Sequence, residues 1–185
     1  MGMKKALSKL ILKMFGWQCK VTVPDLPKCV ICVAPHTSNW DFIVGKLFYN
    51  AAGRHASFLI KKEWFFFPMG VIFRSMGGVP VERGRKNDMV QQMVDLFNKR
   101  DHFQLAITPE ATRKRNPNWK KGFYYIAKRA NVPIVLAYMD YGKKVMGMEV
   151  VFTPTDNEEA DLKYIKHYFT QFTARHPENF ATGDE

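Results

Sequence analysis

The sequence predicts one α/β domain, built on a mostly parallel mixed sheet that is flanked by helices. Short apolar runs rich in β-branched residues alternate with helical stretches along most of the 185 residues, and this alternation is typical of parallel sheets. Hydrophobic residues make up 46% of the chain, which is enough for one sizeable core at this length. No internal repeat or low-complexity linker divides the chain, so we expect a single folded unit.

The first expected element is an amphipathic helix over residues 3 to 16. The apolar side chains on one side of this helix are Leu7, Leu10, Ile11, Met14 and Phe15. Lysines surround the other side, a pattern typical of a helix that lies in a membrane surface. The same pattern fits a helix packed on a protein core with a solvated lysine face. We therefore predict a separate membrane-surface helix over 1–17, with core packing as the open alternative.

Strands and helices then follow in alternation, which defines the main domain over 18–176. Strands are expected near 19–23, 29–34, 57–60, 78–81, 103–107, 133–139 and 147–152. Helices are expected near 39–52, 86–99, 121–130 and 158–174. The remaining residues, 177–185, are expected to form a flexible acidic tail.

The composition restricts the classes of partner. The formal net charge of +11 favours phospholipid headgroups, phosphorylated metabolites or nucleic acid. No helix-turn-helix, zinc-finger or ribonucleoprotein signature is recognisable, so we expect no nucleic-acid partner. Cys29 and Cys32 form a C-x-x-C pattern, but on a strand their side chains would point to opposite faces. We therefore expect buried packing from these two cysteines rather than metal or redox chemistry.

A histidine and a carboxylate flank the turn after the strand at 29–34. Pro35 ends the strand, His36 lies on the turn, and Asp41 lies in the first turn of the next helix. If the chain bends back here, the carboxylate can hold one imidazole nitrogen and leave the other as a base. Asp41 also stands three residues after Ser38, so the alternative is a capping box in which Asp41 only caps its own helix.

Two further polar clusters follow other predicted strands. One strand begins at Gly78 and ends in Arg83, whose guanidinium group suits a phosphate. The other cluster follows the fifth predicted strand, at the kind of strand end where α/β folds usually place ligands. There, Thr112 and Arg113 could bind a phosphate, and Glu110 could hold either arginine in position.

In this order, the motifs resemble those of the glycerophospholipid acyltransferase family, which includes the 1-acylglycerol-3-phosphate acyltransferases. The family's His-x4-Asp motif corresponds to residues 36–41, and its glycine-to-arginine strand to 78–83. Its Glu-Gly-Thr-Arg motif corresponds to 110–113, with Ala111 in place of the glycine, and its Val-Pro-Ile/Val motif to 132–135. The resemblance thus spans most of the domain, and four ordered motifs are a specific signal.

The resemblance implies transfer of a fatty acyl group, from acyl-CoA or acyl carrier protein, to the hydroxyl of a lysophospholipid. The default acceptor is 1-acylglycerol-3-phosphate, and the reaction would need no metal or other cofactor. His36 would act as the general base and Asp41 would orient it. The substrate-binding residues that the resemblance implies are Arg83, Glu110, Thr112 and Arg113. The reaction would take place on the cytoplasmic face of a membrane with an anionic surface.

Two alternatives remain open at this stage. The first is an acyltransferase that acts on another lyso-lipid acceptor, which the change at Ala111 favours. The second is a non-catalytic peripheral lipid-binding protein with the same fold.

The apolar run from Trp64 to Phe73 is too short to span a bilayer. Because cations bracket this run, we expect it to dip into lipid or to form the wall of an acyl-chain pocket, with core filling as the alternative.

Overall fold

Seven strands form one mixed sheet in the computed structural model, which describes residues 2–82 and 86–183. The strands are β1 (Gln18–Val21), β2 (Lys28–Ala34), β3 (Ser57–Lys61), β4 (Gly78–Val81), β5 (Phe103–Ile107), β6 (Ile134–Asp140) and β7 (Val145–Phe152). Their order in the sheet is β1-β7-β6-β2-β5-β3-β4. Only the β6–β7 pair is antiparallel among these strands. The predicted α/β class and the mostly parallel mixed sheet are therefore confirmed.

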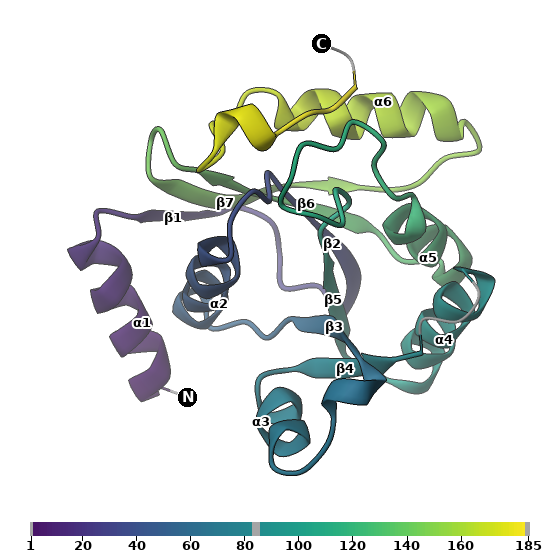
Figure 1. Cartoon of the computed structure of the whole chain (residues 1–185), viewed down its shortest axis with the longest axis horizontal. Coiled ribbons are helices and arrows are strands. Elements are labelled where there is room, and N and C mark those ends of the chain that lie inside the picture. The colour runs from purple at the N-terminus through teal and green to yellow at the C-terminus, as the bar shows by residue number, and fades with distance from the viewer. Residues whose placement is uncertain (1, 83–85, 184–185) are drawn as a thin grey trace.

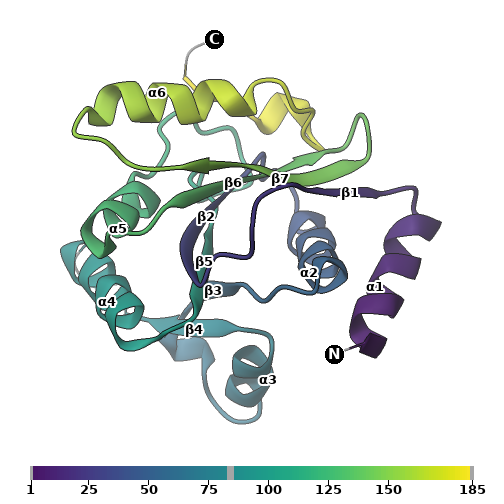
Figure 2. The same cartoon turned by 180° about the vertical axis from the view of Figure 1, so that it is seen from behind.

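Helices cover both faces of the sheet (Figures 1 and 2). The helices α4 (Lys86–Lys99), α5 (Gly122–Ala130) and α6 (Glu158–Phe169) pack on one face. The helices α1 (Gly2–Met14) and α2 (Trp40–Ala52) cover the other. Cys32 packs in the first core and Cys29 in the second, as expected for residues three apart on a strand. Burial raises the pKa of both thiols, so neither is poised as a thiolate.

The N-terminal helix packs on the protein core and also keeps apolar side chains exposed. Leu12 is only 3% exposed and belongs to the core beneath α1 and α2, so the helix packs on the protein. The apolar side chains of Leu7, Leu10 and Met14 remain more than half exposed, and Ile11 is partly buried. One edge of α1 is thus a core contact, while an apolar strip faces outward. No helix in the described ranges is both long and apolar enough to cross a bilayer.

A short helix that the sequence did not predict lies in the apolar run. A 3₁₀ turn over Lys62–Trp64 precedes α3 (Met69–Ser75), which packs beside β4 below the sheet in Figure 1. Phe67 is 87% exposed, and Phe66 and Val71 are also exposed. Core filling is therefore wrong for these side chains. The run instead forms a second apolar surface, flanked by lysines and an arginine.

The C-terminal segment differs from the expected loose tail. The last helix ends at Phe169, five residues earlier than expected, and the chain then folds back over the domain. Ala181 and Thr182 are each 1% exposed, and the indole nitrogen of Trp119 donates a hydrogen bond to the Ala181 carbonyl at 2.8 Å. Apolar contacts and a buried hydrogen bond therefore hold this segment in place, despite its acidic composition.

Candidate active site

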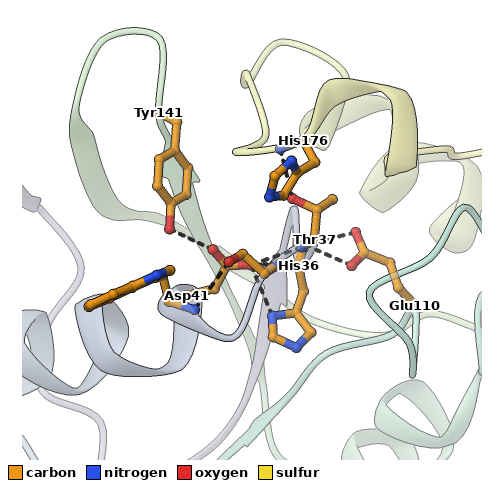
Figure 3. A network of polar contacts seen from close by, with 8 residues as sticks. His36, Thr37, Asp41, Glu110, Tyr141 and His176 are labelled. Carbon is orange, nitrogen blue, oxygen red and sulfur yellow. Dashed lines mark hydrogen bonds and ion pairs between the residues drawn. The ribbon is translucent and has the colours of Figure 1, made fainter.

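The loop after β2 carries the histidine and carboxylate that the sequence singled out. His36 lies two residues beyond the strand, and Asp41 is the second residue of α2. The chain bends back between them, so that His36 Nδ1 lies 3.2 Å from Asp41 Oδ2 (Figure 3). An Nδ1–H that donates to the carboxylate leaves Nε2 as the basic nitrogen of the neutral ring. The predicted contact between the two residues is thus present.

The Asp41 carboxylate collects hydrogen bonds from several directions. Its Oδ2 accepts from the main-chain nitrogens of Thr37 and Ser38, both at 2.8 Å, and its Oδ1 accepts from the Tyr141 hydroxyl at 2.6 Å. Burial by itself would raise the pKa of Asp41, but the hydrogen bonds from His36, Tyr141 and Ser38 outweigh it and lower that pKa. The carboxylate therefore stays ionised although it is 2% exposed.

Asp41 also makes one half of the predicted capping box, because its Oδ2 accepts from the main-chain nitrogen of Ser38. Its bonds to Thr37 and Ser38 satisfy amides of the loop that leads into α2, while the N-cap residue, Asn39, has no side-chain cap hydrogen bond. The same bonds fix the carboxylate in the orientation that meets His36. The conformation of the loop before α2 and the orientation of the imidazole are therefore coupled at this residue.

Glu110 lies beside His36 and contacts its main chain rather than Arg113, one of the two arginines that Glu110 was expected to hold. Its Oε2 and Oε1 accept from the main-chain nitrogen of His36 at 2.7 and 3.1 Å, and it is 4% exposed. Within the described residues, Arg113 makes no ion pair with it, so the prediction that Glu110 holds this arginine is wrong. Burial, reinforced by the negative charge of Asp41 and opposed by the His36 amide, raises the pKa of Glu110 to about 8. Glu110 thus positions the histidine backbone.

The other predicted binding residues differ in position: one lines the cavity beside His36, one does not, and one lies outside the described residues. Arg113 is exposed and lines the cavity that contains His36. Thr112 does not line that cavity, and its hydroxyl oxygen accepts from the Lys114 amide at 3.2 Å. Ala111, where the related motif has glycine, adopts the left-handed conformation with φ of 57°, which is costly for alanine. Arg83 lies outside the described residues.

A large apolar cavity opens next to His36. Its volume is about 850 Å³, within the usual range of small-molecule sites. Much of its wall is apolar, including Phe42, Phe48, Phe58, Leu59, Ala106, Met139 and Met146. Cationic side chains, namely Lys46, Arg113 and Lys120, also border it. The cavity therefore combines an apolar wall, the His36 imidazole and positively charged side chains.

Sequence reasoning missed the residues that enclose the motif from the C-terminal half of the chain. Tyr141 follows β6, and the main-chain nitrogen of His176 donates to Thr37 Oγ1 at 3.1 Å. Both contacts span 100 residues or more, so no local pattern could reveal them. Across the described chain, no cluster of three or more histidine, cysteine or acidic side chains could hold a metal ion.

Comparison with known proteins defines the family. The model of the Acyltransferase family matches residues 20–140, about two thirds of the sequence. The chain belongs to the acyltransferase family. Human 1-acyl-sn-glycerol-3-phosphate acyltransferase beta is 35% identical over 83 residues, which cover 42% of this chain and 30% of the human protein. The chain thus matches less than a third of that relative's length.

A solved structure of the family has the same fold. The 1-acyl-sn-glycerophosphate (LPA) acyltransferase PlsC from Thermotoga maritima superposes with a TM-score of 0.62 and 19% sequence identity. The superposition covers 91% of this chain and 76% of the Thermotoga chain. The two chains therefore share the same architecture.

The raised pKa of Glu110 predicts a pH-dependent stability. Because the folded state favours the protonated acid, its stabilisation is complete below pH 4.5, the ordinary value, and is lost as pH rises through about 8. Relative to Glu110→Gln, the wild-type free energy of unfolding should therefore fall by a few kcal/mol at most between pH 5 and pH 8. Urea titrations at pH 5, 6.5 and 8 measure this difference. The exposed Glu159→Gln is the control, and parallel curves for wild type and Glu110→Gln would contradict the assignment.

Proposed function

We propose that this chain transfers a fatty acyl group from a thioester donor to the hydroxyl of a lysophospholipid, with 1-acylglycerol-3-phosphate as the first candidate acceptor. The observation that carries the proposal is the His36–Asp41 pair at the mouth of an apolar cavity bordered by cations. The donor is acyl-CoA or acyl carrier protein. The names of the human and Thermotoga relatives support the acceptor class.

The reaction follows from the tautomer that Asp41 selects. His36 Nε2 takes the proton of the acceptor hydroxyl as its oxygen attacks the thioester carbonyl. The C–O bond forms, the C–S bond breaks, and the departing thiolate takes the proton back from the imidazolium. Asp41 stabilises the imidazolium while the proton resides there. The products are an ester and a free thiol, and no covalent enzyme intermediate or cofactor is involved.

The cations on the cavity rim bind the acceptor's phosphate in this proposal. Arg113 offers a planar fork of donors, and Lys120 adds a second positive charge on the same cavity. Arg83 belongs to the proposed set on its sequence motif, and Thr112 supports the loop through the Lys114 amide. Glu110 serves the site by holding the main chain of His36. The net charge of +11 favours both anionic substrates.

Replacing the base is the first test of the proposal. His36→Ala should fold normally and lose at least 10³-fold in kcat, whereas Asp41→Asn should keep partial activity because the base remains. The assay follows release of free thiol from acyl-CoA with lysolipid acceptors, and mass spectrometry identifies the product. A well-folded His36→Ala protein with wild-type turnover would disprove the role of His36. A wild type inactive with every donor and acceptor would favour a non-catalytic lipid-binding protein.

The cavity leads to a second prediction, on acyl-chain length. Gly45 lines the cavity one turn beyond Asp41 on α2, and a Cβ added there would meet no atom within 4 Å. Gly45→Leu should therefore fill cavity space and lower kcat/KM for long-chain donors about tenfold or more, while short-chain donors change less than about threefold. Gly2→Leu, which adds the same side chain in open space on α1, is the control. An unchanged chain-length profile for Gly45→Leu would place the acyl chain elsewhere.

We further propose that the protein docks on the cytoplasmic face of an anionic membrane through two surfaces. One is the exposed apolar strip of α1, with its lysines, and the other is the apolar surface before and on α3. Each lysine near an anionic surface contributes about 1 kcal/mol, and the apolar side chains add burial. Such binding is reversible and weakens as salt screens the charges.

Point variants can test docking without removing α1, whose Leu12 supports the core. Changing Leu7, Leu10 and Met14 to Gln, or Phe66 and Phe67 to Ser, should reduce flotation with phosphatidylglycerol-containing vesicles several-fold. Activity on a water-soluble short-chain substrate should survive in both variants. Tyr164→Ser, an exposed aromatic residue on α6, is the control. Wild-type flotation of both variants at low and high salt would contradict this mode of docking.

A further inference from the structure

Tyr141 reaches the active site from a part of the chain that the motifs do not include. It follows β6, in the turn that leads to β7, and its hydroxyl donates to Asp41 Oδ1 at 2.6 Å. The other oxygen of Asp41 serves His36 and the two loop amides. Tyr141 is thus the donor that fixes the second oxygen, and with it the rotation of the carboxylate (Figure 3).

Contacts on several sides hold the Tyr141 ring in place. Its main-chain nitrogen donates to the Thr173 carbonyl at 2.8 Å. The Trp17 ring meets it edge-on, with centroids 5.0 Å apart. The guanidinium carbon of Arg175 lies 5.8 Å from its centroid and 5.6 Å from that of Trp40. Because these contacts fix the ring, they also fix the direction of the hydrogen bond from its hydroxyl group to Asp41.

The protonation states agree with this arrangement. Burial, reinforced by the hydrogen bond to Asp41, raises the pKa of Tyr141, so the phenol remains a donor at neutral pH. The titratable groups that contact the Asp41 carboxylate are His36 and Tyr141. Glu110 lies near enough for the charge of Asp41 to help raise the pKa of Glu110, and Arg175 and His176 approach from the segment after α6. Among these, Tyr141 and His36 donate to Asp41 through side chains.

We propose that Tyr141 is a positioning residue of the active site, which fixes the Asp41 carboxylate and through it the imidazole of His36. The proposal rests on the proposed role of His36 as the base. Tyr141 also draws charge from the carboxylate, because a hydrogen bond to an anion partly neutralises it. Loss of the hydroxyl should therefore alter both kcat and the pH dependence of the reaction.

Tyr141→Phe removes only the hydroxyl and keeps the ring between Trp17 and Arg175. We expect kcat to fall about tenfold, with both KM values within about twofold of wild type, because the orientation of the base is disturbed and binding is not. The acidic limb of the kcat/KM profile should move to higher pH, because a less neutralised carboxylate holds the proton on His36 more strongly. Unchanged kcat and an unchanged acidic limb would overturn the proposal.

A double-mutant cycle separates positioning from a general structural effect. If Tyr141 acts through Asp41, Tyr141→Phe should cause no further loss of kcat in an Asp41→Asn background. Multiplied losses would overturn the proposal. The matched control is Tyr124→Phe, which removes another hydroxyl bonded to a buried aspartate, Asp161, at 2.8 Å. This control should lower the melting temperature and leave the pH profile as in wild type.

A graded variant covers the case in which Tyr141→Phe does not fold. Replacing Tyr141 with 3-fluorotyrosine by stop-codon suppression keeps the hydroxyl and makes it a stronger donor. The acidic limb should then move to lower pH, opposite to the shift in Tyr141→Phe, and no movement would overturn the proposal. Full activity of His36→Ala would instead refute the proposed base, so the two hypotheses fail through different measurements.

Discussion

Asp41 places a negative charge where water hardly reaches, and that charge is stable because hydrogen-bond donors surround it. Two main-chain amides, the His36 imidazole and the Tyr141 hydroxyl share its two oxygens. Removal of any one donor would leave an ionised group less compensated, which is costly in a buried site. The shape of the loop after β2, the start of α2 and the tautomer of His36 all follow from this carboxylate.

The sheet explains how these donors come together. β6, β2 and β5 are neighbours and run parallel, so the loops after them leave from the same edge. The loop after β2 carries His36, the loop after β5 carries Glu110, and the turn after β6 carries Tyr141. Crevices at the carboxyl ends of parallel strands are the usual ligand sites of α/β folds. The position of the candidate active site is therefore a consequence of strand order.

Glu110 illustrates why charge alone is a poor guide to buried contacts. Its sequence neighbours are basic, which suggested an ion pair with an arginine. In the structure, the side chain turns inward to the amide of His36, while Arg113 remains exposed on the cavity rim. A buried carboxyl group needs a fixed hydrogen-bond partner, and an amide at a strand end provides one without ordering a long side chain. The two acidic residues of the site thus hold the same histidine, one through its ring and one through its backbone.

The sequence by itself determined the α/β class, the seven strands of the described sheet and the contact between His36 and Asp41. Alternation of apolar runs with helices, and a proline that ends β2, are local signals that survive folding. Only the tertiary structure decided the inward turn of Glu110, the packing of 177–182 and the contact from Tyr141. These depend on strand order and on contacts between residues up to 100 positions apart in the sequence. The helix α3 was missed for a related reason, because a run that is apolar on all sides carries no helical period.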